Sequence, residues 1–308
     1  MKHTSLLLFF GLLLAACTQA QETVYPAKPF EGELFLTNAV IHVGNGQVIE
    51  KGILHITNNK ITAVGSDLSL PADKAKILDV KGSHVYPGLI VAASQLGLVE
   101  VPPVRATVDA VEIGDFNPNV RSIVAYNTDS KVINTLRSNG ILLAEVYPGG
   151  SLLTGSSSVV QLDAWNWEDA AYSMDHGIHF MMPSLLGRRD GGGRGAGRFG
   201  PQQQEAADPV KKSMEQIESV KQFFREAKTY FTTTEHPSTN LKFQSVRGLF
   251  DRKQKFYIHC DIVKEILAAV DFVKEFGFDV VIVGGRDSWM IPDILKQNNM
   301  AVILSQMH

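Results

Sequence analysis

The chain has 308 residues, of which 44% are hydrophobic and 20% are charged. This is an ordinary globular composition with enough apolar residues for at least one sizeable core, and the length suggests roughly one to three domains. The formal net charge of -3 at pH 7 is typical of neither nucleic-acid-binding proteins nor proteins that bind acidic membrane surfaces by charge. We therefore expect no nucleic-acid partner.

Residues 1–20 are predicted to be a signal peptide rather than part of the fold. The apolar run from Leu6 to Ala16 is too short to span a bilayer but is typical of a signal-peptide core. It ends in "LAAC", which resembles a bacterial lipoprotein signal with Cys17 as the lipidated residue. Ordinary cleavage after Ala20 is the alternative and would give a soluble secreted protein. We expect a protein of the periplasm or cell envelope that is held at the membrane through a lipid anchor.

Short strands are predicted over residues 34–84, after a polar tether at residues 21–33. "ELFLTNAVIHV" and "KGILHITNNKITAVG" contain apolar runs of strand length that are rich in Val, Ile and Thr. Asn45-Gly46 and Asn58-Asn59 lie between these runs, and both residue types accept the positive φ of tight hairpin turns. The pattern predicts a small antiparallel β unit.

The pattern changes after Pro87-Gly88, where apolar runs alternate with helical stretches. Helical spacing of apolar residues predicts a helix from Ile262 that ends at Gly277, a residue typical of helix C-caps. Strand, helix and strand in alternation indicate a parallel α/β sheet or barrel. The predicted buried strands are residues 140–150, 177–183, 255–261, 278–285 and 300–306.

A low-complexity segment at residues 187–209 interrupts this pattern. Gly dominates it and Arg recurs, so we interpret it as an insertion that cannot bury enough surface to order itself. Asp208-Pro209 then begins a predicted amphipathic helix, with Ile217, Val220 and Phe224 among the residues on its apolar side.

Three segments together resemble the amidohydrolase superfamily, in particular its imidazolonepropionase-like branch. They are "NAVIHVGNG", "GILHITNNKITAVG" and "DVKGSHVYPGLI". The resemblance continues more weakly through "GGSLLTGSSSVVQLDAWNWEDAA" and "VIVGGRDSW", which are similar to an exported bacterial subgroup. It implies a (β/α)8 TIM-type barrel, incomplete here over residues 85–308, with a small N-terminal β-sandwich to which residues 34–84 contribute. It also implies that the chain is a fragment of a longer protein, because the family's last barrel strands and an Asp on the eighth would follow His308.

The family's members hydrolyse carbon–nitrogen bonds in cyclic amides, ureas or amidines with one or two zinc-type ions. A bound divalent ion lowers the pKa of its water towards about 7 and polarises the carbonyl. The resemblance places the first ligands at alternate residues of the first barrel strand, so that both side chains lie on one face. Here the positions of the family's Asp and two His are Val91, Ala93 and Gln95. Gln95 offers only a weak amide oxygen to such an ion, and we treat it as a substrate-binding candidate.

His259 matches the family's histidine on the fifth strand, as a metal ligand or a catalytic residue. The alternative is a core histidine that is bonded to a backbone carbonyl. Gly284 stands near the sixth-strand histidine position, and Arg286 and Asp287 follow it. These two residues are candidates for substrate binding and catalysis, respectively, or form a surface pair. We expect His179 to have a surface or packing role, because the predicted strand places it on the N-terminal side, away from barrel chemistry.

Two hypotheses follow. The first is a hydrolase of non-peptide carbon–nitrogen bonds in cyclic amide-like small molecules, with an atypical or reduced site for zinc or another divalent metal, or with no metal. The second is a non-catalytic envelope lipoprotein that binds a small ligand or peptide at the barrel mouth. The losses at Ala93 and Gln95 favour the second on chemical grounds.

Overall fold

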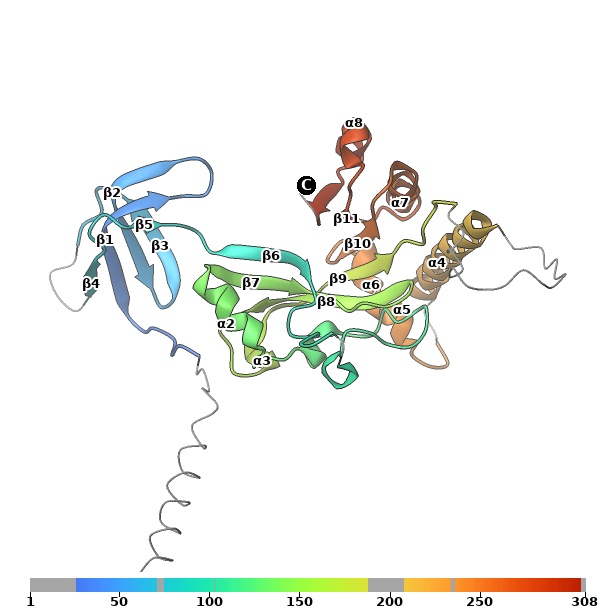
Figure 1. The fold of residues 1–308 in the computed structure, drawn as a ribbon, viewed down its shortest axis with the longest axis horizontal. Helices are drawn as coiled ribbons and strands as arrows, with labels where there is room; N and C mark the ends of the chain where they lie inside the picture. Colours follow the sequence, from blue (N-terminus) through green and yellow to red (C-terminus); the bar gives the residue numbers. More distant parts are fainter. Residues whose placement is uncertain (1–25, 71–74, 103, 188–207, 234–235, 306–308) are drawn as a thin grey trace, which may run out of the picture. The chain divides into compact units, whose positions relative to one another are not determined.

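The computed structural model describes residues 26–70, 75–102, 104–187, 208–233 and 236–305 (Figure 1). The predicted signal peptide with Cys17, and most of the segment 187–209, lie outside the described residues. Within the described ranges, no helix combines the length and the apolar character needed to cross a membrane. The chain divides into two compact units, one up to Pro87 with residues 163–165 and one that holds the rest.

The first unit contains a five-stranded sheet around β1. The hairpin predicted at Asn58-Asn59 is present, and both residues have positive φ, of 48° and 64°. Strands β1, β2 and β3 are antiparallel, as predicted, but β4 and β5 pair with β1 in parallel. The described strands form one sheet, so the sandwich stays a prediction. The strands are β1 (Glu33–His42), β2 (Val48–Thr57), β3 (Lys60–Gly65), β4 (Lys76–Asp79) and β5 (His84–Val85).

The second unit contains a seven-stranded sheet in the order β12-β11-β10-β9-β8-β7-β6. The predicted strands of this unit are confirmed, and they run parallel to β6. An unpredicted strand, β8, runs antiparallel to both of its neighbours. The described sheet therefore departs from a strict (β/α)8 pattern, in which all strands are parallel. The strands are β6 (Leu89–Ser94), β7 (Ile141–Val146), β8 (Leu153–Gln161), β9 (Ala171–Met181), β10 (Lys255–Cys260), β11 (Val280–Gly284) and β12 (Ala301–Leu304).

Helices of the second unit have the end signals that the sequence predicts. The Asp208 side chain accepts a hydrogen bond from the backbone N–H of Val210 at the start of α4, and Gly277 ends α7 with a φ of 72°. The helices are η2 (Arg105–Thr107), η3 (Ser122–Ala125), α2 (Lys131–Ser138), α3 (Trp167–Ala170), α4 (Pro209–Thr232), α5 (Leu241–Ser245), α6 (Arg247–Phe250), α7 (Val263–Phe276), η4 (Ser288–Met290) and α8 (Pro292–Gln297).

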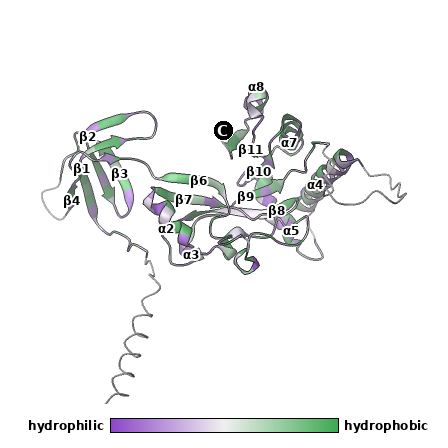
Figure 2. Cartoon of the chain, in the orientation of Figure 1, coloured by the Kyte–Doolittle hydropathy of each residue, from purple (hydrophilic) through white to green (hydrophobic). Residues whose placement is uncertain are grey.

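The two faces of this sheet have different environments. Alternate residues of β9 and β10, such as Phe180 and Phe256, belong to the main apolar core, to which α4 and α7 contribute Phe224 and Ile266. Figure 2 shows the hydrophobic character of β9 and α7. We call the opposite face the inner face. It carries a smaller apolar group at one side, made of Tyr257, Val281 and Val283 with Ala93 and Ile303.

Candidate functional site

The inner face holds a set of buried and half-buried polar side chains, which we call the inner-face cluster. Because side chains alternate along a strand, the apolar neighbours of His179 on β9 face the core while His179 faces inward. Its partner in the register of β10 is Tyr257, and His259 follows on the same face. The cluster consists of Glu145 of β7, Tyr147 just after β7, Ser157 of β8, His179 of β9, and Tyr257 and His259 of β10.

His179 is completely buried and is fixed between two tyrosine rings. The rings of Tyr147 and Tyr257 stack on it, each with a centroid separation of 4.6 Å and interplanar angles of 5° and 10°. Its Nδ1 lies 2.9 Å from Nε2 of His259, within hydrogen-bond distance. Its Nε2 has no hydrogen-bond partner among the described residues, and the nearest charged oxygen is Oε1 of Glu145 at 3.8 Å.

Glu145 provides a buried negative charge. Only 5% of its surface is exposed, and Ser157 Oγ donates a hydrogen bond to its Oε1 at 2.9 Å. Burial alone would raise the pKa of Glu145, but His179 and the hydroxyls of Ser157 and Tyr257 together lower this pKa below its ordinary value. Glu145 is therefore ionised at neutral pH.

The charge of Glu145 determines where the protons of the two histidines lie. An anionic carboxylate favours a proton on Nε2 of His179, which leaves Nδ1 as an acceptor for the N–H of His259 Nε2. The other nitrogen of His259, Nδ1, then carries a free lone pair. Burial lowers the pKa of His259 to about 3, with a smaller contribution from His179, so this ring is neutral at pH 7.

A zinc-type ion does not fit the described donors. The ring centroids of His179 and His259 are 5.2 Å apart, close to the largest separation that a 2.9 Å N···N contact allows. The two nitrogens therefore point at each other, whereas ligands of one ion point at a common centre about 2.0–2.1 Å from each. Within the described ranges, no group of three or more His, Cys, Asp or Glu residues is placed to hold an ion.

The other predicted site residues lie around the carboxyl ends of β6 and β11. Gln95 follows β6, and its Nε2 packs closely against Gly149. A Cβ added at Gly149 would lie only 2.6 Å from this nitrogen. Arg286 and Asp287 follow β11 and pair with each other, with Nε and Oδ1 3.3 Å apart. In the described part of the chain, no hydrogen bond or ion pair joins these three residues to the inner-face cluster.

The structure corrects the placement of His179 and adds residues that the sequence analysis missed. The prediction that His179 lies on the N-terminal side of its strand is wrong, because β9 begins at Ala171 and His179 lies near its carboxyl end. Glu145 was not selected, although a lone carboxylate within "GILLAEV" is a detectable signal. Ser157 lies in the Gly- and Ser-rich stretch "GGSLLTGSSS", which has no clear strand pattern, and only the pairing of β8 shows that it is buried.

The cluster combines an anion, two neutral imidazoles in series and one free lone pair at the carboxyl ends of strands. Such an arrangement can accept a proton at His259 and stabilise the resulting charge through His179 and Glu145. It can equally bind a ligand that donates a hydrogen bond. In (β/α)8 barrel enzymes, reactions take place at the carboxyl ends of the strands.

Comparisons with known proteins bear on the fold. No family model matches the chain, and no curated protein sequence matches it. Among solved structures, an amidohydrolase from Thermotoga maritima is similar with a TM-score of 0.74 and 20% identity, over 88% of this chain and 70% of that one. A prolidase in complex with N-methylphosphonate-L-proline (TM-score 0.43, 13% identity, 88% and 66% coverage) and a second amidohydrolase (0.43, 12%, 88% and 66%) are too distant to interpret. The amidohydrolase resemblance is thus confirmed at the level of the fold, whereas the imidazolonepropionase-like branch stays a prediction.

Proposed function

We propose that this chain is a hydrolase of non-peptide carbon–nitrogen bonds in cyclic amide-like small molecules, with the inner-face cluster as its reaction centre. The observation that carries the proposal is the series His259, His179 and Glu145 at the carboxyl ends of strands. His259 lies within hydrogen-bond distance of the buried His179, and His179 lies 3.8 Å from the buried carboxylate of Glu145. The fold that the chain shares with the Thermotoga amidohydrolase supports this reaction class.

The proposed reaction begins with His259 as a general base. As a water oxygen bonds to the carbonyl carbon, its proton moves to Nδ1 of His259 and the carbonyl π electrons move to the oxygen. The carbon–nitrogen bond then breaks, and the same proton passes to the leaving nitrogen, so that one water is added overall. A pKa of about 3 makes His259 a weak base in the resting protein, but the negative charge that forms on the substrate raises this pKa.

Glu145 and His179 act as positioning residues in this scheme. The stacked tyrosines fix the plane of His179, and the carboxylate fixes which nitrogen carries its proton. The scheme uses no metal ion, because the described donors do not converge on one. The sequence-based expectation that His259 binds zinc or another divalent metal stays a prediction, which metal measurements test directly.

Turnover of a panel of cyclic amides, cyclic ureas and cyclic amidines by the full chain tests the proposal. We expect ring opening by the wild-type protein and a loss of about 10²- to 10⁴-fold in His259→Ala, the usual range for removal of a general base. The exposed His236 stacks on Tyr230 outside the cluster, so His236→Ala is the matched control and is expected to keep full activity.

Elemental analysis of the same proteins provides the second measurement. The proposed scheme predicts equal and substoichiometric divalent metal in wild type and His259→Ala. Stoichiometric zinc that is lost in His259→Ala would contradict the metal-free scheme and support His259 as a ligand. Equal turnover in wild type and His259→Ala would exclude His259 as the base.

A second candidate function is a non-catalytic envelope lipoprotein that binds a small ligand or peptide at the same end of the sheet. The side chain of Ala93, which lies on the inner face, supplies no donor there, and this observation favours the candidate. Saturable binding of a cyclic amide without any turnover would support it over the hydrolase. For either function we propose a location in the periplasm or cell envelope with a lipid anchor on Cys17, and labelling of cells with a lipid precursor before and after Cys17→Ser tests it.

A further inference from the structure

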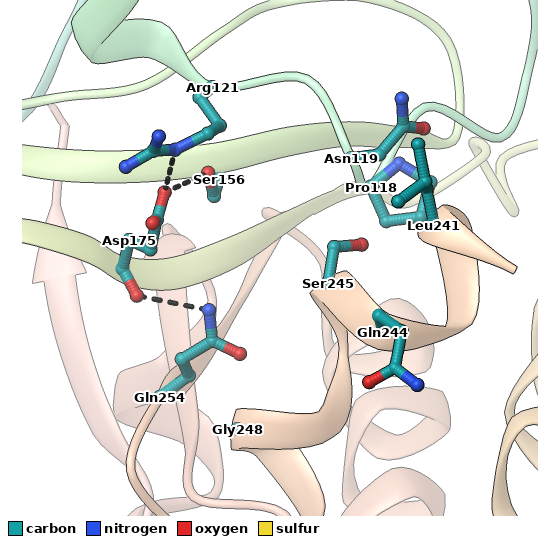
Figure 3. Close-up of a pocket in the computed structure, with 10 residues that line it drawn as sticks. All are labelled: Pro118, Asn119, Arg121, Ser156, Asp175, Leu241, Gln244, Ser245, Gly248 and Gln254. Carbon is teal, nitrogen blue, oxygen red and sulfur yellow. Dashed lines mark hydrogen bonds and ion pairs between the residues drawn. The ribbon is translucent and has the colours of Figure 1, made fainter. Parts of the chain in front are cut away.

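A pocket of about 550 Å³ lies at the opposite ends of the same strands (Figure 3). It is lined by Asp175 of β9 and by Gln254, which lies just before β10. The pairing of β9 with β10 begins at Gly177 and Lys255, so both lining residues come before the paired part of their strands. The cluster at His259 is near the carboxyl end of β10, so this pocket is a separate site. Its volume falls within the range of about 300–1,000 Å³ that is usual for small-molecule sites.

Asp175 is fixed in this pocket by its backbone and its side chain. Its backbone N–H donates to Ser158 Oγ at 3.1 Å, and its carbonyl accepts from Gln254 Nε2 at 3.0 Å. Its Oδ1 accepts from Ser156 Oγ and from Arg121 Nε, both at 2.8 Å. The residue has a φ of 52°, a strained conformation that these contacts maintain. Figure 3 shows the contacts of Asp175 with Arg121, Ser156 and Gln254.

The contacts leave a defined set of unused polar atoms. Within the described part of the chain, Oδ2 of Asp175 and Nη1 of Arg121 have no hydrogen-bond partner. The first is an acceptor and the second is a donor. The side chains are about two-fifths exposed, at 37% and 39%, so a ligand can reach them.

The charges of Arg121 and Asp175 already neutralise each other across their 2.8 Å contact. A charged ligand would gain little net attraction here and would lose its hydration. A hydroxyl group can either donate to Oδ2 of Asp175 or accept from Nη1 of Arg121. Two neighbouring hydroxyls of one ligand can therefore make the two hydrogen bonds at the same time. Across the pocket, Leu241 provides an apolar surface that is 68% exposed, and the buried Pro118 lies beside it in the lining.

We propose that this pocket binds a neutral polyhydroxylated molecule, of the class of a mono- or disaccharide, with its hydroxyls on the Arg121–Asp175 pair and its C–H face on Leu241. The proposal is independent of the hydrolase proposal, because it uses no residue of the inner-face cluster.

Calorimetric titration of the full chain with a panel of neutral mono- and disaccharides tests this site, with free amino acids and dipeptides as the charged comparison. We expect binding of at least one saccharide in the micromolar to millimolar range and weaker or no binding of the charged compounds. Asp175→Asn keeps the backbone conformation, which Asn tolerates, but replaces the acceptor at Oδ2 with a donor. The loss of a charge-assisted contact predicts a decrease in affinity of about tenfold or more.

Two further variants separate a binding effect from a folding effect. Leu241 is exposed, so Leu241→Ala is expected to preserve the fold and to weaken the saccharide severalfold. Asp271 forms a surface ion pair with Lys221 on other helices, so Asp271→Asn is the matched control and is expected to leave binding unchanged. Absence of saccharide binding, tighter binding of the charged compounds, or unchanged affinity in both Asp175→Asn and Leu241→Ala would overturn the proposal.

Discussion

The burial of His259 predicts a specific loss of stability in mild acid. Its folded-state pKa of about 3 is far below the ordinary value of 6.5, so the unfolded chain binds a proton that the folded chain rejects. The contribution of neutral His259 to the free energy of unfolding is therefore fully present above about pH 6.5. It is lost progressively as the pH falls towards 3. Between pH 7 and pH 5, this one group is expected to lower the free energy of unfolding by about 2 kcal/mol.

Urea denaturation at the two pH values measures this difference, with far-UV circular dichroism as the signal. His259→Gln cannot titrate, so its free energy of unfolding is expected to fall by about 2 kcal/mol less than that of the wild type over this interval. Glu145 contributes little here, because its pKa is lowered from 4.5 and its own loss comes at more acidic pH. An exposed-site variant, His236→Gln, is expected to keep the full pH dependence. Equal pH dependence in wild type and His259→Gln would refute the buried, neutral state of His259.

Two further substitutions probe the inner-face cluster. Ser157→Ala removes the donor at 2.9 Å from a buried carboxylate, so we expect a loss of about 1–3 kcal/mol in the free energy of unfolding by urea denaturation, and a loss below about 0.5 kcal/mol would show that Glu145 is solvated. Gly177→Ala would place a Cβ 2.4 Å from the ring of Tyr257, which stacks on His179. We expect this overpacking to cost about 1–3 kcal/mol and to lower the melting temperature, and unchanged melting would show that the ring can move aside.

The elements with strong local signals were predictable from the sequence. Helix α7 has regular apolar spacing and a glycine that adopts a positive φ at Gly277, and the strand that carries His259 is a short apolar run with no competing interpretation. In the first unit, Asn58-Asn59 gave the hairpin correctly, but the parallel pairing of β4 with β1 depends on contacts between distant residues and has no local signal.

The features that were missed depend on tertiary contacts. Strand β8 is rich in serine, and the buried Ser157 hydroxyl is satisfied there by donating to Glu145. The position of His179 depended on the start of β9, and an error of six residues in that boundary moved the histidine from one end of the strand to the other. Element boundaries are the least certain part of a prediction from local pattern, and here the candidate site lies at such a boundary.

The two tyrosine rings that enclose His179 also restrict rotation of its imidazole. A ring held between parallel planes cannot easily tip over to exchange its two nitrogens, so each nitrogen keeps the same neighbour throughout the life of the folded state. The two nitrogens of this imidazole are therefore not interchangeable: one always faces His259 and the other always faces Glu145. Because both aromatic planes face it, their ring currents shift its carbon-bound protons upfield, and this gives the site a magnetic resonance signature that requires no added label.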